Sequence, residues 1–224
     1  MARFVRENGL SIFFGLLFLG ALTGQAIAGH IAYNAEQVAH GEQAISLGRY
    51  LTSSAFGQAV MENWQSEYLQ FLLFITATVW LVQRGSPESK QPGEEGVESE
   101  RKQGIGGWAG RGAPALARAG DWRTAIYGNS LLIVMGSIFL LSLFAQSVTG
   151  WNVYNDEQVV HHSSAVSWWT YVGTADFWEA ALQNWQSEFL AVGSMAIFAI
   201  FLRQRGSPES KPVGAPHHKT DVSG

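Results

Sequence analysis

Carboxylate and imidazole side chains recur at a fixed spacing in this chain. The pattern Y-N-x-E-Q-V-x-H occurs twice and places Glu36 four residues before His40, and Glu157 four residues before His161. Residues at i and i+4 share one face of a helix. With a second carboxylate, each pair could form a metal site of two carboxylates and one imidazole. The alternative is an amphipathic helix at a membrane interface, with these side chains in water.

A second polar cluster stands at the start of two hydrophobic blocks, where the run N-W-Q-S-E is repeated. Its Asn, Ser and Glu are spaced i, i+3, i+4 and therefore lie on one helical stripe. A carboxylate inside a membrane is costly to bury, which makes it a candidate proton or ion site, and it would also complete the metal set. The alternative is a carboxylate at the interface that reaches water. The residues of this polar layer are Gln25, Asn63, Ser66 and Glu67, repeated as Gln146, Asn184, Ser187 and Glu188.

The depth of these residues predicts how they pair. Glu67 lies 17 residues before Arg84, or about 25 Å along a helix axis, and Gln25 lies at a similar depth in the first hydrophobic block. We therefore expect a hydrogen bond between Gln25 and Glu67, repeated between Gln146 and Glu188.

Composition excludes several classes of chemistry. The chain has no cysteine, which excludes disulfides, thiolate metal sites and a cysteine nucleophile. The net charge of -4 implies no nucleic-acid partner. No nucleophile–base set, phosphate loop or dinucleotide fingerprint is present, so the sequence predicts no catalytic residue and requires no cofactor.

The elements that must position these residues are four hydrophobic blocks. They span about Leu10–Ala28, Trp64–Val82, Leu131–Thr149 and Trp185–Leu202. Each approaches the roughly 20 residues that cross a hydrocarbon core of about 30 Å. The first block has a second interpretation as a signal peptide cleaved after Ala28. The repeat described below favours its retention, because the matching third block lies in the middle of the chain.

The basic residues predict the orientation of these blocks. Of the 14 Lys and Arg residues, 13 lie before the first block, between the second and third, or at and beyond the end of the fourth; Arg49 is the exception. Lys and Arg favour the cytoplasmic side. We therefore expect both termini and the central linker in the cytoplasm, with residues 29–58 and 150–179 outside.

An internal repeat organises the chain. A shift of 121 positions aligns residues 8–90 with 129–211 without a gap, and 35 of the 83 pairs are identical. We expect two parallel two-helix repeats, residues 1–90 and 122–211, joined by a flexible linker at 91–121 and followed by a disordered tail at 212–224. Because each repeat crosses twice, the pseudo-twofold axis should lie along the membrane normal.

The longest identical run is QRGSPESK, at Gln83–Lys90 and Gln204–Lys211. A helix stop with a basic flank explains its Arg, Gly and Pro. It does not explain the shared Glu, Ser and Lys, which could contact a cytoplasmic partner or lipid headgroups. The candidate contact residues are Arg84, Lys90, Arg205 and Lys211.

These motifs resemble a family of bacterial membrane proteins known as a domain of unknown function. The likeness rests on NWQSE(Y/F)L, QRGSPESK and Y-N-x-E-Q, and covers roughly residues 5–211. It implies a bacterial inner-membrane protein and supplies no activity or catalytic residue.

The sequence as a whole predicts an all-α membrane protein with four transmembrane helices. Its leading functional interpretation is a non-enzymatic structural or accessory component in the lipid bilayer, with a protein partner or a second copy of itself. The first alternative is a small ion- or proton-coupled transporter that uses Glu67 and Glu188. The second is a metal-binding protein or enzyme at the outer face.

Overall fold

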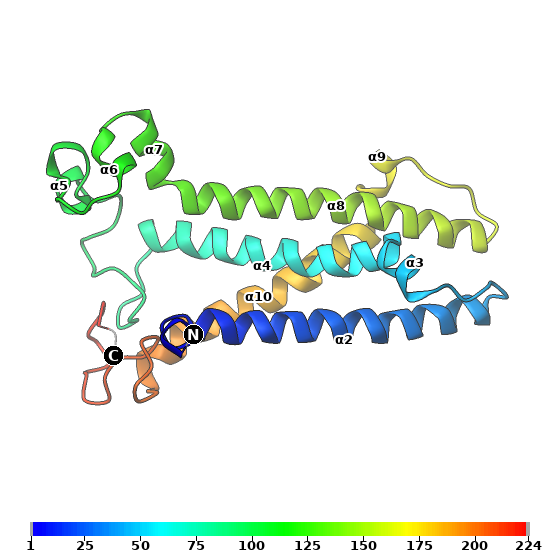
Figure 1. The fold of residues 1–224 in the computed structure, drawn as a ribbon, viewed down its shortest axis with the longest axis horizontal. Coiled ribbons are helices and arrows are strands. Elements are labelled where there is room, and N and C mark those ends of the chain that lie inside the picture. The colour runs from blue at the N-terminus through cyan, green and yellow to red at the C-terminus, as the bar shows by residue number, and fades with distance from the viewer. Residues whose placement is uncertain (1, 223–224) are drawn as a thin grey trace. The chain divides into compact units, whose positions relative to one another are not determined.

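The chain is all-α in the computed structural model (Figure 1). The structure describes residues 2–222, and no strand occurs in that range. The helices are α1 (Ala2–Glu7), α2 (Gly9–Ala39), α3 (Leu47–Leu51), α4 (Ser54–Trp80), α5 (Glu100–Gln103), η1 (Gly106–Trp108), α6 (Ala115–Ala119), α7 (Trp122–Gly128), α8 (Ser130–Val160), α9 (Trp168–Tyr171) and α10 (Ala175–Phe201).

Helices α2 and α8 are the longest, at 31 residues each (Figure 1). Their most apolar windows have mean hydropathies of 1.9 and 2.2. No residue of α2 is buried, and large side chains such as Phe14 and Leu16 are 60% and 67% exposed. By length and composition both helices could cross a membrane.

Helices α4 and α10 have 27 residues each and do not pass the same test of length and hydropathy within the described residues. Each carries the polar NWQSE run in its middle, and this run lowers its mean hydropathy. Length and composition therefore support two of the four predicted spans, and the other two are not supported.

Two compact units divide the chain, and they do not follow the sequence repeats. The first contains the residues up to Val60 together with Ala145–Tyr171. The second contains Met61–Phe144 and Val172–Gly224. Each unit draws on both repeats, so the division gives no support to the predicted pseudo-twofold symmetry.

In the first unit, the start of α4 packs against the end of α8. A Cβ atom on Gly57 would lie 2.9 Å from Cγ2 of Thr149, so the glycine permits a close helix approach. Asn152 Nδ2 donates to Ser54 Oγ at 3.2 Å. These contacts join the N-terminal end of α4 to the C-terminal half of α8, two helices that come from different repeats.

The C-terminal ends of α2 and α8 are capped in the same way. After α2, the Glu42 N–H donates to the Gln37 carbonyl, and Gly41 has φ +80°. After α8, the Ser163 N–H donates to the Gln158 carbonyl, and His162 has φ 57°. This is a Schellman-type cap, which requires a left-handed residue and normally uses glycine.

Helix α4 ends at Trp80, before the QRGSPESK segment. Its last helical hydrogen bond runs from the Leu81 N–H to the Ala77 carbonyl. Two residues further on, the Gln83 N–H donates to Ser89 Oγ at 2.8 Å and so leaves the helical pattern. The QRGSPESK segment therefore forms a loop of its own.

The linker and the tail contain short helices and hydrogen-bonded turns. Residues 100–128 form α5, η1, α6 and α7. In the tail, Thr220 Oγ1 accepts from the Gly85 N–H at 2.9 Å, and the Asp221 N–H donates to the Ser86 carbonyl. Both segments therefore have defined contacts within the second unit.

Candidate functional site

Asn34 fixes the first outer loop against α2. Its Oδ1 accepts from the Ile45 N–H at 2.8 Å, and its Nδ2 donates to the Ile45 carbonyl at 2.9 Å. His30 Nε2 lies 2.7 Å from the same carbonyl oxygen. One amide side chain thus satisfies both backbone groups of a loop residue, as a neighbouring strand would.

The second outer loop uses the same device. Asn155 Oδ1 accepts from the Val166 N–H at 2.8 Å, and its Nδ2 donates to the Val166 carbonyl at 3.1 Å. Trp151 stands where the first loop has His30, and its Nε1 donates to that carbonyl at 2.7 Å. The Asn of the Y-N-x-E-Q motif is therefore a loop-fixing residue in both places.

Two buried tyrosines close the loops onto glycines. Tyr50 is 5% exposed and its hydroxyl lies directly against Gly29, where a Cβ atom would clash with it. Tyr171 is 4% exposed and stands in the same way against Gly150. Burial, and secondarily the nearby Tyr33, raises the pKa of the Tyr50 hydroxyl. Both tyrosines therefore pack their hydroxyl groups against a glycine that leaves room for them.

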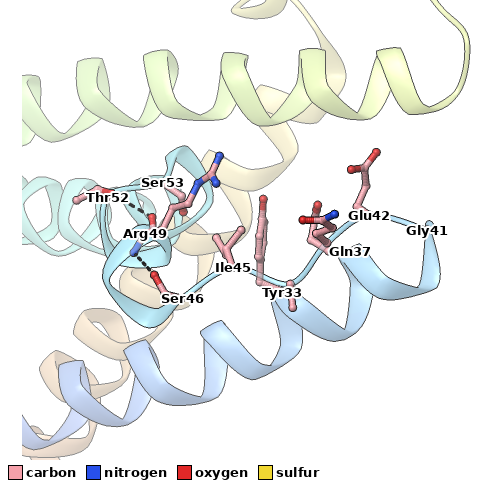
Figure 2. Close-up of a pocket in the computed structure, with 11 residues that line it drawn as sticks. Tyr33, Gln37, Gly41, Glu42, Ile45, Ser46, Arg49, Thr52 and Ser53 are labelled. Atoms are coloured by element: carbon pink, nitrogen blue, oxygen red, sulfur yellow. Dashed lines mark hydrogen bonds between the residues drawn. The ribbon is translucent and has the colours of Figure 1, made fainter.

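A polar pocket of about 810 Å³ opens between the end of α2 and α3 (Figure 2). Figure 2 shows Arg49, Tyr33 and Glu42 projecting toward the same side, with the two charged residues at opposite ends. The full lining is Tyr33, Gln37, Gly41, Glu42, Gln43, Ala44, Ile45, Ser46, Arg49, Thr52 and Ser53. Such a surface suits a small polar solute, or a partner segment, that carries both signs of charge.

The charges of this pocket belong to the first repeat alone. At the positions that match Arg49 and Glu42, the second repeat has Thr170 and Ser163. Sequence reasoning used Arg49 for orientation and did not assign it to a site. Its position as the single basic residue in either outer loop is the signal that could have identified it.

The Glu–His pairs lie at the outer ends of α2 and α8. His40 Nδ1 donates to the backbone carbonyl of Glu36 at 3.0 Å, so the side chain caps its own helix. Among residues 2–222, no group of three or more His, Cys, Asp or Glu side chains could hold a metal ion. The structure thus gives Glu36, His40, Glu157 and His161 no shared metal geometry, and their metal role stays a prediction.

The polar layer of α4 and α10 joins the two helices through a residue that was not predicted. Gln65 is 0% exposed, and its Oε1 accepts from Trp185 Nε1 at 2.6 Å. Ser66 is also buried, and its hydroxyl donates to the Asn63 carbonyl within the helix. Asn63, Glu67 and Ser187 are exposed, and Asn184 is half-buried.

Glu67 on α4 and Glu188 on α10 both lie in the second unit, where the two helices contact each other. Gln70 Nε2 donates to the Glu188 backbone carbonyl at 3.5 Å. Glu67 is exposed and Glu188 is half-buried, and a shared proton or cation site at these carboxylates stays a prediction.

Gln25 has a different partner from the one expected. Its Nε2 donates to the Ala59 carbonyl at 3.4 Å, eight residues before Glu67 on α4. Gln146 is 1% exposed, and its Oε1 has no hydrogen-bond partner among residues 2–222. The predicted Gln–Glu hydrogen bonds are therefore absent from the described contacts, because Gln25 bonds to backbone about two turns earlier on α4.

The two QRGSPESK segments fold into the same loop. Ser89 Oγ accepts from the Gln83 N–H at 2.8 Å, and Ser210 Oγ accepts from the Gln204 N–H at 2.9 Å. In each loop the Glu N–H also donates to the hydroxyl of the preceding motif Ser, at 3.3 Å and 3.2 Å. The motif thus encodes a loop held by its serine hydroxyls.

The two motif lysines form hydrogen bonds and an ion pair within the protein. Lys211 is 1% exposed and its Nζ donates to four backbone carbonyls, those of Gly85 (2.6 Å), Pro216 (3.4 Å), His217 (2.9 Å) and Lys219 (3.3 Å). Lys90 Nζ donates to the Gly96 carbonyl and pairs with Glu98 at 2.7 Å. This ion pair is the main cause that lowers the pKa of Glu98 to about 2.

The motif arginines and glutamates differ from the lysines. Arg84 and Arg205 are exposed, so of the four predicted contact residues they are the two with accessible side chains, and their contact with a partner stays a prediction. Burial raises the pKa of Glu88, and a hydrogen bond to Glu209 and its charge raise it further. Glu88 and Glu209 occupy the same position in their motifs.

The helices and contacts described above define an all-α protein with two helices that could cross a membrane. The chain belongs to the family described as a domain of unknown function (DUF6766), which matches residues 1–222. No curated protein and no solved structure matches it. The predicted resemblance to a family of unknown function is therefore confirmed, whereas the bacterial origin stays a prediction.

Proposed function

We propose that this chain is a multi-pass protein of a bacterial inner membrane, with four spans formed by α2, α4, α8 and α10. Its role is structural or accessory, without catalysis of its own. One observation carries this proposal: the polar residues that both repeats share hold backbone in place. Asn34, Ser89 and their counterparts Asn155 and Ser210 each bind main-chain groups of their own loop.

The membrane assignment is supported by uncovered apolar surface. The most apolar window of α2 is 0% buried and that of α8 is 17% buried, whereas a core helix of a soluble protein is mostly buried. Water does not tolerate an apolar surface of this size, but a bilayer does. Retention of α2 is favoured because Gln25 contacts α4 and because cleavage after Ala28 would cut the helix in its middle.

The absence of native cysteine allows a direct test of topology. Single cysteines at Gln43 and Ser164 would report on the two outer loops, and one at Glu94 would report on the linker. A membrane-impermeant maleimide should label the first two in intact cells and the third after permeabilisation. The four-span topology would be overturned if only one of Gln43→Cys and Ser164→Cys were labelled in intact cells. Release of the protein from the membrane by alkaline carbonate would also contradict it.

In this role the pocket beside Arg49 is where a partner would bind the outer face. Crosslinking from Gln43→Cys in cells should give one discrete product, which Arg49→Gln should diminish. Ser164→Cys, at the matching site without charges, is the matched control. Equal products from both cysteines would argue against a partner site in this pocket.

The second candidate function is proton or cation transport. It is favoured by the contact between the helices that carry Glu67 and Glu188, because Gln70, three residues after Glu67, donates to the Glu188 backbone carbonyl. Vesicles that contain the protein and a pH-sensitive dye should then show a flux. The double variant Glu67→Gln, Glu188→Gln should abolish that flux and leave thermal unfolding nearly unchanged. If the wild-type vesicles show no flux and the variant only loses stability, the structural role is favoured.

A further inference from the structure

The linker between the two repeats folds into a small helical cluster, residues 100–128. Thr124 holds it together, because its Oγ1 donates to the Leu116 carbonyl at 2.6 Å and accepts from the Gly120 N–H at 2.8 Å. Gly106 and Gly120 pack closely: a Cβ atom on Gly120 would lie 3.5 Å from Cα of Gly106. We call residues 100–128 the linker cluster (α5, η1, α6 and α7; Figure 1).

The linker cluster displays apolar side chains that nothing in its own fold covers. Trp122 is 70% exposed, Trp108 58% and Ile126 52%, although these are side chains that proteins normally bury. Trp122 and Ile126 are spaced i, i+4 and so share one face of α7, whereas Thr124 of the same helix is buried. The face of α7 that carries Thr124 therefore packs inside the cluster, whereas the face that carries Trp122 and Ile126 is exposed.

The charge of the linker cluster is positive. It contains five basic residues, Arg101, Lys102, Arg111, Arg118 and Arg123, and two acidic ones, Glu100 and Asp121, which leaves a net charge of +3. Arg123 pairs with Asp121 at 2.9 Å, and Arg101 lies over the Trp108 ring at 5.3 Å. Arg111 and Arg118 are exposed and form no ion pair within residues 2–222, so they can contact an external anion.

The linker cluster lies directly before α8 in the chain, and this position indicates what it could bind. Helix α7 ends at Gly128 and α8 begins at Ser130, so one residue separates α7 from a helix that could cross a membrane (Figure 1). Tryptophan concentrates at the interface of a bilayer, and clusters of Lys and Arg beside a span bind anionic headgroups. Both features stand together in this segment.

We propose that the linker cluster binds the anionic headgroup surface of the membrane that α8 enters. Trp122 and Ile126 lie among the headgroups, and Arg111 and Arg118 contact lipid phosphates. This inference rests on the proposed membrane topology and gives the linker a role of its own: it holds the second repeat to the inner leaflet at the point where α8 begins.

A spin label on the full chain tests this proposal. Ile126→Cys is labelled and the protein is placed in vesicles of phosphatidylcholine, with or without phosphatidylglycerol. The label should be shielded from a neutral, water-soluble nickel chelate when phosphatidylglycerol is present. A label at Glu94→Cys, in the acidic stretch before the cluster, is the matched control and should stay accessible.

The basic residues provide the second arm of the test. A single Lys or Arg near an anionic surface is worth about fivefold in affinity. Arg111→Gln with Arg118→Gln should therefore expose the Ile126→Cys label again, and high salt should have the same effect. These residues are exposed, so their replacement should leave the fold intact.

Three outcomes would overturn the proposal. The first is a label at Ile126→Cys as accessible as that at Glu94→Cys in phosphatidylglycerol vesicles. The second is equal shielding in phosphatidylcholine alone, and the third is shielding that persists in detergent, which would indicate contact with protein. Flotation with the vesicles is scored separately, because a protein that does not float contradicts the membrane topology, whereas a floating protein with an exposed label contradicts only this inference.

Discussion

The ammonium group of Lys211 donates to the carbonyl oxygen of Gly85 at 2.6 Å, although 126 positions separate the two residues in the chain. This bond joins the last residue of one QRGSPESK loop to the glycine of the other. Three carbonyls of the tail complete the shell around the same ammonium group. The lysine thus ties both motif loops and the tail into one structure.

Replacement of Lys211 by methionine should loosen this structure. The variant leaves four carbonyls without their charged donor, which we expect to cost about 2–4 kcal/mol locally. Hydrogen exchange of the Gly85 amide, which donates to Thr220, should then accelerate at least about thirtyfold. Lys219→Met is the control, because that side chain is exposed, and an unchanged Gly85 amide would contradict the role given to Lys211.

The contact between Gly29 and Tyr50 predicts a compensating pair of substitutions. Gly29→Ala places a methyl group against the tyrosine hydroxyl and should destabilise the protein by about 1–3 kcal/mol. Tyr50→Phe removes that hydroxyl, after which the nearest ring atom lies at 3.2 Å, so the double variant should recover much of the loss. The unfolding free energies of the wild type, the two single variants and the double variant, measured in detergent, form a double-mutant cycle. Gly24→Ala, with open space around it, should be neutral or stabilising; strict additivity would refute the contact.

The left-handed backbone at His162 predicts a stabilising substitution. The first repeat has glycine at the matching position, Gly41, and a non-glycine residue with positive φ costs about 1 kcal/mol. His162→Gly should therefore raise the unfolding free energy by about 1 kcal/mol, and Gly41→Ala should lower it by a similar amount. A loss of stability in His162→Gly would show instead that the imidazole makes a needed contact.

The raised pKa of Glu88 predicts a pH dependence. Because this pKa is raised in the folded state, the folded state binds the proton more tightly than the unfolded state. The stability from Glu88 is fully present below the ordinary carboxyl pKa and is lost as the pH rises through the raised value. Glu88→Gln should thus stabilise the two QRGSPESK loops near neutral pH and have little effect near pH 4. Thermal unfolding at both pH values provides the comparison; an equal effect at both would rule out a raised pKa of Glu88.

The ion pair of Lys90 and Glu98 predicts a pH dependence of stability with the opposite sign. The pKa of Glu98 is lowered to about 2, so its stabilisation is fully present above the ordinary value of 4.5 and is lost as the pH falls toward 2. Glu98→Gln should remove this dependence, which exchange of the Gly96 and Glu98 amides between pH 5 and pH 3 can follow. A wild-type profile that is flat over this range would contradict the ion pair.

The sequence alone determined the all-α class, the two long apolar helices and many of the residues that fix the loops. Local periodicity and composition suffice for these, because a run of some 20 apolar residues permits few structures other than a helix. The shared motifs also contain Asn34 and Ser89, but they do not reveal the partners of these residues. Those partners are backbone groups, and no sequence pattern encodes which of them a side chain will reach.

Tertiary structure alone decided the rest. It placed Trp185 on Gln65 and Lys211 on Gly85, contacts between segments more than 100 residues apart. Long-range contacts of this kind depend on how whole helices pack, and the free energy of that packing is not contained in any local stretch of residues.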